Sequence, residues 1–330
     1  MKAAYIEETG PADNITYGDL PKPELTGAHV LVKTAAVAVN PVDTYIRNGA
    51  NYWELPKPFI IGCDLAGKVE ATGPDVTRFK IGDRVWGTNQ GLMGRQGTFA
   101  EYCAVDECWL YSTPDDVSDE TAAACALVGV TAHLGLFSKA NLQSGESIFV
   151  HGGTGGVGSM VVQMANAAGA RVITTGGSDE KCARAKELGA DVAVNYKAQD
   201  IAAAIKEFAP NGVNVVWETL REPDFDALTS YLAERGRLVL MAGRDARPPF
   251  PVGPFYVKEC SLHGIAMFKA SPDELRACSV DMNHWMSEGK LKAQIGKTLP
   301  LAEAAAAHKL QEENTLQQSG TLAGKIVLKP

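Results

Sequence analysis

Short runs of β-branched and apolar residues, separated by glycines and prolines, fill the first third of the chain. The clearest runs are His29 to Val39, Phe59 to Thr72, Gly82 to Trp86 and Thr98 to Tyr102. Glycine and proline favour turns, so these runs have the pattern of strands, and Pro41 to Arg47 has that of one short helix. We therefore expect a β-rich domain here.

A helical pattern begins after Ser118, a residue suited to cap a helix. Thr121 to Phe137 is rich in alanine, leucine and valine, which predicts one or two helices.

From Ser147 onward, short apolar runs alternate with amphipathic segments. The expected strands are Ser147 to His151, Arg171 to Thr175, Asp191 to Val194, Val213 to Trp217 and Arg237 to Met241. This alternation predicts a parallel sheet covered by helices on both faces.

The sequence pattern changes again toward the end of the chain. From about Ser271 it is helical and rich in alanine, and it closes with an apolar run, Lys325 to Leu328. We expect this last run to be a strand that returns to the first domain. The length of 330 residues fits two domains.

A glycine-rich segment, Gly153-Thr154-Gly155-Gly156-Val157-Gly158, joins the strand that begins at Ser147 to the helix that follows it. It matches the G-x-G-x-x-G pattern of dinucleotide-binding domains, in the strand-to-helix context that makes this pattern informative. The first glycine permits a tight turn, the second lets the backbone approach a pyrophosphate, and the third lets helix and strand pack closely. The start of the helix adds N–H donors and a positive dipole for the phosphates.

The end of the second strand of this domain predicts which dinucleotide binds. An NAD site commonly has Asp or Glu there to bind the ribose hydroxyls, but this chain has Gly176-Gly177, which leaves room for a 2′-phosphate. Lys181 lies one helical turn further on, and Tyr196 and Lys197 follow the next strand. We therefore expect NADPH. The alternatives are that Lys181 is only a solvated helix residue and that Asp179 binds the ribose.

Six motifs, spread over nearly the whole chain, resemble those of the medium-chain dehydrogenase/reductases, and within them the zeta-crystallin type of quinone oxidoreductase. Besides the glycine loop they are Asn40-Pro41-Val42-Asp43-Thr44-Tyr45-Ile46-Arg47-Asn48-Gly49, Gly62-Cys63-Asp64-Leu65-Ala66-Gly67, Gly82-Asp83-Arg84-Val85, Ala100-Glu101-Tyr102 and Gly324-Lys325-Ile326-Val327-Leu328. The resemblance implies an α/β fold: a Rossmann doubly wound parallel sheet over residues 123–265, plus a GroES-like β-rich catalytic domain formed by residues 1–122 and completed by residues 266–330.

The same resemblance assigns residues to an NADPH site. It implies that Tyr45 contacts the cofactor phosphates, that Asn40 lies near the nicotinamide and the substrate, and that the glycine loop binds through Thr154, Gly155, Gly156 and Val157. Gly177, Lys181 and Tyr196 would line the adenosine phosphate, and the nicotinamide half would be flanked by Ala242, Gly243, Arg244, Met267 and Phe268. Two departures from relatives put single contacts in question: Asp224 stands where an asparagine is common, and Ser319-Gly320 where some relatives have arginine.

No metal site is expected. Zinc-dependent members of the superfamily have a cysteine where Asn40 stands and a histidine where Cys63 stands, so too few ligands remain for a three-ligand catalytic zinc. The seven cysteines lack the close spacing of a structural zinc lobe, and the six histidines have no HxH or HxxxH spacing. Cys63 is either a buried apolar cysteine or a reactive thiol.

Without zinc a carbonyl is not strongly polarised, whereas a quinone or an activated alkene accepts hydride readily. We expect NADPH-dependent, zinc-independent reduction of a quinone, driven by proximity and orientation. Asn40 would donate a hydrogen bond to the acceptor oxygen, and Tyr52 or solvent would supply the proton. Tyr52 as a mere pocket wall is the alternative. Two other functions stay open: an NADPH-dependent 2-alkenal or enoyl reductase, and a crystallin-like NADPH- or RNA-binding protein with little turnover.

Composition narrows the partners. A net charge of -8 argues against nucleic acid and anionic membranes. No run of 18 apolar residues occurs, so we expect no membrane span. The odd number of cysteines and the lack of a CxxC pair favour reduced thiols, and therefore a cytoplasmic protein. The expected partner is the small-molecule quinone or enone acceptor of the hydride-transfer reaction. Ser261 to Met267 would be an exposed edge strand, and the family resemblance implies a homodimer or homotetramer.

Overall fold

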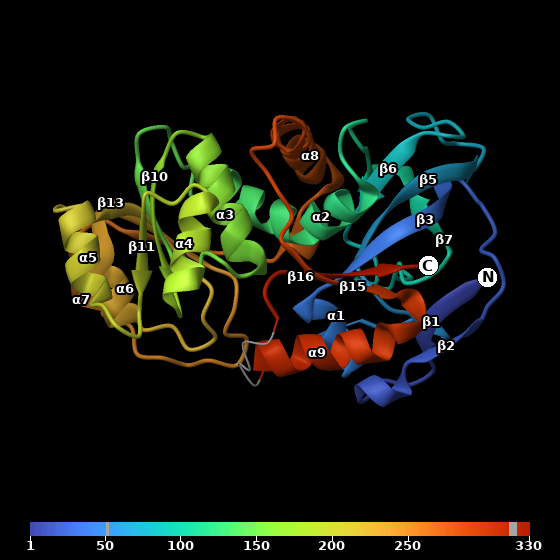
Figure 1. Cartoon of the computed structure of the whole chain (residues 1–330), viewed down its shortest axis with the longest axis horizontal. Coiled ribbons are helices and arrows are strands. Elements are labelled where there is room, and N and C mark those ends of the chain that lie inside the picture. The colour runs from blue at the N-terminus through green and yellow to red at the C-terminus, as the bar shows by residue number, and fades with distance from the viewer. Residues whose placement is uncertain (51–52, 317–321) are drawn as a thin grey trace. The chain divides into compact units, whose positions relative to one another are not determined.

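A computed structural model describes residues 1–50, 53–316 and 322–330 of the chain (Figure 1). It divides into two compact units. The first consists of Met1–Leu127 and Phe268–Pro330, and the second of Val128–Met267. The boundaries expected from sequence, after residues 122 and 265, lie a few residues from these divisions. Both ends of the chain thus belong to one unit.

A seven-stranded sheet forms the core of the first unit. Its strands run in the order β15-β16-β3-β5-β6-β8, with β7 also paired to β3. The bounds are β3 (His29–Val39), β5 (Asp64–Thr72), β6 (Arg84–Gly87), β7 (Tyr102–Asp106), β8 (Leu110–Ser112), β15 (Ile295–Pro300) and β16 (Lys325–Lys329). The last strand, β16, pairs antiparallel with β3, so that Val327 lies opposite Ala38. The predicted return of the C-terminal strand is confirmed.

A second, smaller sheet in this unit joins β2 (Thr16–Asp19), β1 (Lys2–Ile6) and β4 (Phe59–Ile60). The run from Phe59 to Thr72 therefore belongs to two sheets. The chain turns between them at Gly62, which has a φ of +101°, and a Cβ there would lie 2.1 Å from the Phe99 ring. Glycine is the residue that tolerates both conditions.

Among the described residues, three α-helices lie entirely in the first unit: α1 (Pro41–Arg47), α8 (Pro272–Ser287) and α9 (Ala304–Leu316). The bounds of α1 are those predicted from sequence. The segment after Ser271 is not continuously helical, because β15 separates α8 from α9. That strand is parallel to β16. A strand of this kind depends on its distant partner, so the local sequence pattern does not predict it.

Residues Asp119–Lys139 form a continuous helical stretch of 21 residues that includes α2 (Asp119–His133). The predicted cap is present, since the Ser118 hydroxyl accepts a hydrogen bond from the Thr121 N–H at 3.1 Å. By length and composition this stretch could cross a membrane, although it contains no unbroken run of 18 apolar residues. However, 83% of its most apolar 18-residue window is buried within the protein, as in the core helix of a globular domain.

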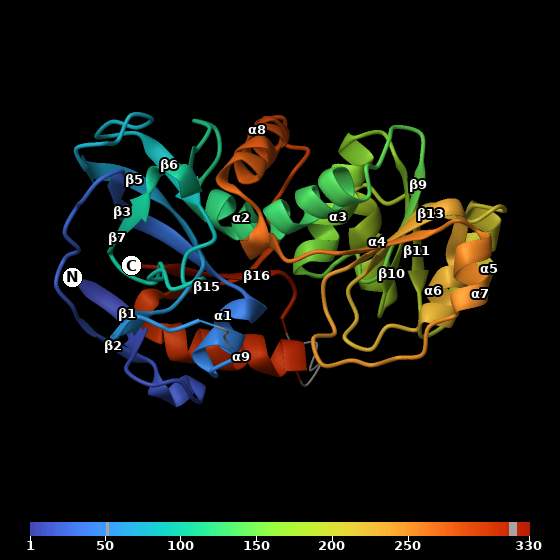
Figure 2. The same ribbon diagram turned by 180° about the vertical axis from the view of Figure 1, so that it is seen from behind.

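The second unit contains a six-stranded parallel sheet in the order β11-β10-β9-β12-β13-β14. The strands are β9 (Ser147–Val150), β10 (Arg171–Gly176), β11 (Val192–Asn195), β12 (Val213–Glu218), β13 (Leu232–Leu240) and β14 (Ser261–Gly264). Helices α3 (Gly156–Ala167) and α4 (Asp179–Glu187) cover one face, and α5 (Ile201–Phe208), α6 (Phe225–Tyr231) and α7 (Val252–Val257) cover the other (Figures 1 and 2). The predicted doubly wound Rossmann sheet is confirmed.

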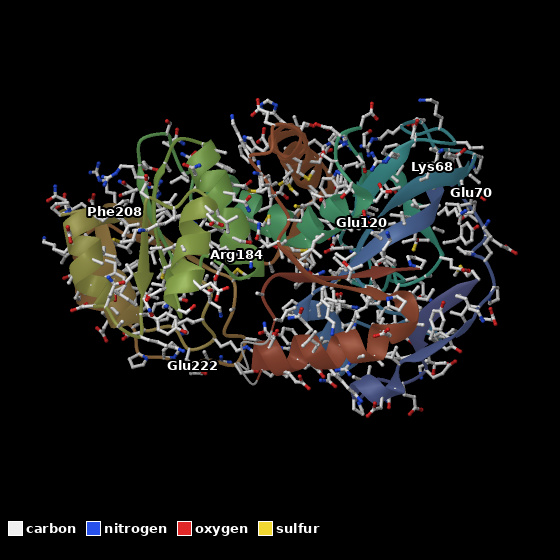
Figure 3. All side chains as sticks on the ribbon, in the orientation of Figure 1. Lys68, Glu70, Glu120, Arg184, Phe208 and Glu222 are labelled. Carbon is white, nitrogen blue, oxygen red and sulfur yellow. The ribbon has the colours of Figure 1, made fainter. Side chains whose placement is uncertain are left out.

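Burial follows the predicted patterns in both units. The core of the second unit joins Phe149, Ile173 and Val216 of the central strands to Ile205 and Phe208 of α5; Phe208 is labelled in Figure 3. On β5 of the first unit, Lys68 and Glu70 alternate with the buried Val69 and are exposed (Figure 3). The parallel sheet is therefore buried on both faces, whereas the second half of β5 alternates between buried and exposed positions.

Candidate functional site

The glycine loop lies at the carboxyl end of β9, where the chain turns into α3. The left-handed residue of this turn is Gly152, with a φ of +76°, rather than the first glycine of the motif. Gly153 is needed for packing, because a Cβ would lie 2.2 Å from Thr174 Oγ1, and at Gly158 a Cβ would lie 2.2 Å from the Gly152 carbonyl. The third glycine thus has the close-packing role that the sequence suggested.

Gly155, by contrast, faces outward. It is exposed, caps α3, and would place a Cβ no closer than 3.4 Å to the Gly152 carbonyl. The amides of Gly156 and Val157 belong to the first turn of α3, where a helix has no internal acceptors. Together with the half-buried Thr154 they form an open cradle of N–H donors at a helix N-terminus. This is an arrangement that binds phosphate.

The carboxyl end of β10 carries the residues expected to select the cofactor. Gly177 lies so close to Tyr196 that a Cβ would be 2.7 Å from the phenol oxygen. Ser178 caps α4 by accepting the Lys181 N–H at 3.2 Å. Within the described residues no hydrogen bond or ion pair involves the Lys181 ammonium. Lys181, in the first turn of α4, and Tyr196, in the turn that follows β11, therefore both lie near Gly177.

Asp179 and Asp224, the two acidic residues that bear on the predicted choice of cofactor, have other partners. Asp179 accepts a hydrogen bond from the Asn195 amide at 2.7 Å. Asp224 caps α6 by accepting the Ala227 N–H at 3.1 Å. Both carboxylates are therefore engaged in local structure, which weakens the case for a ribose-binding carboxylate.

The residues expected around the nicotinamide half lie after β13 and β14. Gly243 has a φ of +79°, and a Cβ there would lie 2.6 Å from the Arg221 carbonyl, while Ala242 and Arg244 are exposed. Met267 is buried at the end of the second unit. Phe268 begins the returning part of the first unit, where its ring packs 6.0 Å from that of Trp53.

In the first unit, Asn40 lies in a buried polar cluster with Asp43, Cys63, Asp64, Thr88 and Lys325. Lys325 donates to the Val39 carbonyl at 2.7 Å and to Asn40 Oδ1 at 2.5 Å. The Asn40 amide donates to Asp64 Oδ2 at 2.8 Å and, at 3.3 Å, to the Ala38 carbonyl. The Thr88 hydroxyl donates to the other Asp64 oxygen at 2.6 Å. The amide of Asn40 thus connects a buried ammonium to a buried carboxylate.

This geometry changes what Asn40 can do. Its side chain is fully buried, and both amide hydrogens donate within the protein. In this arrangement no donor is left for an acceptor oxygen, contrary to the role expected from sequence. Tyr45 is half-buried on α1, and Tyr52 lies outside the described residues, as does Ser319-Gly320.

Burial controls the acidity of the cluster. It raises the pKa of Asp43 to about 7, aided by the negative charge of Asp64 and opposed by hydrogen bonds from the Cys63 thiol and the Asn40 N–H. It also raises the pKa of Asp64, an effect opposed by the Lys325 charge. Burial and the two carboxylates hold the pKa of the Cys63 thiol well above its usual range. Cys63 is therefore buried, as in the first of its two predicted alternatives, but its surroundings are polar and not apolar.

Lys325, Asp64 and Asp43 belong to three of the family motifs, but the sequence alone assigns none of them a role. A lysine at the start of the apolar run Ile326-Val327-Leu328 is the local signal that was available, because a buried lysine needs acceptors and a counter-charge. No group of three or more histidine, cysteine or acidic side chains suited to a metal occurs among the described residues.

Comparisons with known proteins agree with both halves of this architecture. Residues 26–115 match the alcohol dehydrogenase GroES-like domain family, and residues 156–283 match the zinc-binding dehydrogenase family. Human quinone oxidoreductase is 31% identical over 330 residues, spanning 99% of this chain and 97% of its own. The chain belongs to the medium-chain dehydrogenase/reductase superfamily, in its zeta-crystallin-like branch. It is an oxidoreductase.

Other members of this superfamily show how varied the chemistry is. A Burkholderia 2-haloacrylate reductase is 28% identical over 94% of the chain and 95% of its own length. A mycobacterial protein solved in complex with NADPH has a TM-score of 0.86 at 32% identity, over the full length of both chains. A structure described as an NAD-dependent alcohol dehydrogenase has a TM-score of 0.89 at 31% identity, also over both full chains.

Proposed function

We propose that this chain is a zinc-independent, NADPH-dependent reductase that transfers hydride to a quinone or a similarly activated acceptor. The observation that carries the cofactor assignment is the end of β10, where Gly177 stands in place of an acidic residue and the Lys181 ammonium has no partner among the described residues. The similarity to quinone oxidoreductases supports the acceptor, and the similarity to a mycobacterial protein solved with NADPH supports the cofactor.

Each part of the proposed site has a defined task. The bound cofactor supplies the hydride. The first turn of α3 and the glycine loop bind the pyrophosphate through backbone amides, and Lys181 and Tyr196 bind the 2′-phosphate. The Asn40 amide, fixed by Lys325 and Asp64, and the buried charge-compensated cluster around it would form a rigid wall of the site. They would not act as a Lewis acid. Tyr52 remains the predicted proton donor, with solvent as the alternative.

The acceptor class is tested by NADPH oxidation with a naphthoquinone and with a 2-alkenal. We expect the higher kcat/KM with the quinone, because its reduced product is aromatic and needs no polarising metal. A clear preference for the alkenal would instead support an enal or enoyl reductase, a second candidate favoured by the similarity to 2-haloacrylate reductase. Binding of NADPH without turnover of either acceptor would favour a crystallin-like role.

Cofactor selectivity is tested at Gly177 and Lys181. A hydrogen bond to a charged group contributes about 1.5–3 kcal/mol, so Lys181→Ala should weaken NADPH by about tenfold and leave NADH nearly unchanged. Gly177→Asp should reduce the preference further by adding like-charge repulsion. Its new Cβ also displaces the exposed phenol of Tyr196, which would remove a second proposed contact to the 2′-phosphate.

The measurement is the ratio of kcat/KM for NADPH and NADH with one acceptor. Lys186→Ala is the matched control, because it removes an exposed lysine from the last turn of the same helix. A wild-type ratio near unity, or one that favours NADH, would contradict the proposal and return the ribose role to Asp179 or Asp224.

A further inference from the structure

A histidine–glutamate pair lies beside the glycine loop and has no part in the site as described so far. His151 immediately follows β9, and Glu218 ends β12. His151 Nδ1 and Glu218 Oε2 are 3.0 Å apart. The side chain of Glu218 is 2% exposed and that of His151 is 19% exposed. A buried carboxylate therefore orients an imidazole that reaches the surface of this unit.

The position of the pair in the sheet is informative. From β9 the sheet continues through β10 to β11 on one side, and through β12 to β14 on the other. β9 and β12 are parallel neighbours, with Val150 opposite Trp217, so the next residues of the two strands are His151 and Glu218. This is the topological switch point, and in open parallel sheets ligands bind in the crevice at the carboxyl ends of the strands there.

The surroundings hold both residues in place. The second carboxylate oxygen of Glu218 accepts the Leu220 N–H at 2.5 Å. The His151 N–H donates to the Trp217 carbonyl at 2.9 Å, and the His151 carbonyl accepts from the Thr219 hydroxyl at 2.7 Å. The ring of Phe149 lies 5.6 Å away, between centroids. With Nδ1 engaged by Glu218, the polar ring atom left without a partner among the described residues is Nε2.

We propose that His151 is a dinucleotide-binding residue, oriented by Glu218, whose Nε2 hydrogen-bonds the pyrophosphate–nicotinamide riboside half of the cofactor. This inference rests on the proposed dinucleotide site and adds a residue to it. A protonated Nε2 donates to a phosphate oxygen and a neutral one accepts from a ribose hydroxyl, so either form of the ring has one hydrogen bond to offer. Glu218 is a positioning residue, because it acts through the imidazole.

The test compares two ligands by calorimetry. NADP⁺ contains both halves of the cofactor, whereas 2′,5′-ADP contains only the adenosine half and its phosphates. His151→Gln should weaken NADP⁺ by about tenfold, as expected for the loss of one hydrogen bond to a charged or partly buried group. It should change the Kd of 2′,5′-ADP by less than about twofold. A general loosening of the fold would weaken both ligands together, and that result would overturn the proposal.

Glu218→Gln provides the second variant. It keeps the size of the side chain and an acceptor for Leu220, so we expect a smaller loss for NADP⁺ and, again, little change for 2′,5′-ADP. Because Glu218 acts through His151, the double variant should bind NADP⁺ no more weakly than His151→Gln alone. If His151→Gln does not fold, Glu218→Gln decides the question by itself. His263→Gln, in the edge strand β14 of the same sheet, is the control and should leave both ligands unchanged.

The outcomes separate the two proposals. Wild-type protein that binds neither ligand refutes the dinucleotide site itself. Wild-type protein that binds NADP⁺, together with a His151→Gln variant of equal affinity, refutes only the role of His151.

Discussion

At the scale of single residues, the most unusual feature is the concentration of ionisable groups in the core of the first unit. Asp43, Cys63, Asp64 and Lys325 are all nearly or fully buried. An isolated buried charge costs several kcal/mol, so such groups occur where partners compensate them. Here Asn40 links Lys325 to Asp64, and the Lys325 charge opposes the rise in the pKa of Asp64, while burial raises the pKa of Asp43 to about 7.

The Asp43→Asn variant tests this assignment through pH. The folded pKa of about 7 lies above the ordinary 3.8, so between these values the unfolded chain loses a proton that the folded protein keeps. The unfolding free energy of the wild type should therefore fall as pH rises from about 4 to about 7, by about 4 kcal/mol from this group alone. The asparagine variant lacks this fall, although it can still accept the Asn40 N–H.

The measurement is denaturant unfolding of both proteins at several pH values. The difference between them should shift in favour of Asp43→Asn across that window and be constant outside it. Asp273→Asn, which changes an aspartate that is 86% exposed, is the reference for removing a surface carboxylate. Parallel curves for wild type and Asp43→Asn would show that Asp43 ionises freely in the folded state.

At the scale of elements, β14 combines two features of a binding edge. It is the last strand of the six-stranded sheet, so one side of it has no partner strand within the described chain. Leu262 on this strand and Val252, Tyr256 and Val257 on the preceding α7 are all exposed. An apolar edge of this kind favours pairing with another chain, and a two-fold partner is the commonest solution.

We therefore predict a homodimer or homotetramer in which β14 pairs with its copy. Light scattering at micromolar concentration should give at least twice the mass of 35.1 kDa. Leu262→Glu should shift the protein toward monomer by placing like charges across the edge. Val280→Glu, at an equally apolar and 64% exposed position on α8, is the control. A monomeric wild type would contradict the prediction.

At the scale of the whole molecule, the prediction concerns metal. The positions where zinc-dependent relatives have ligands are held here by Asn40 and Cys63, and Lys325 already places an ammonium on the Asn40 oxygen. A divalent cation at this point would be repelled by that charge at low effective dielectric.

Elemental analysis of the purified protein should accordingly find no stoichiometric zinc. Prolonged treatment with a chelator should leave kcat unchanged for a good acceptor. If one zinc per chain is found and its removal abolishes activity, the zinc-ligand positions of this chain have been misassigned.

The sequence by itself determined the two-domain α/β organisation, most of the order of elements and the place of the glycine loop. These depend on local physics: apolar periodicity distinguishes strand from helix, and a glycine run between a strand and a helix produces the turn whatever surrounds it. The bounds of α1, the cap at Ser118 and the parallel sheet could all be predicted for this reason.

Only the tertiary structure decided what depends on residues that are distant in the chain. It placed Lys325 on Asn40, which removed the free donor expected there, and it brought His151 to Glu218 across two neighbouring strands. It also made Ile295–Pro300 a strand, because the acceptors for that segment lie on β16. Neither hydrogen-bond partners nor the burial that shifts a pKa is encoded in local spacing, since both arise when the sheets assemble.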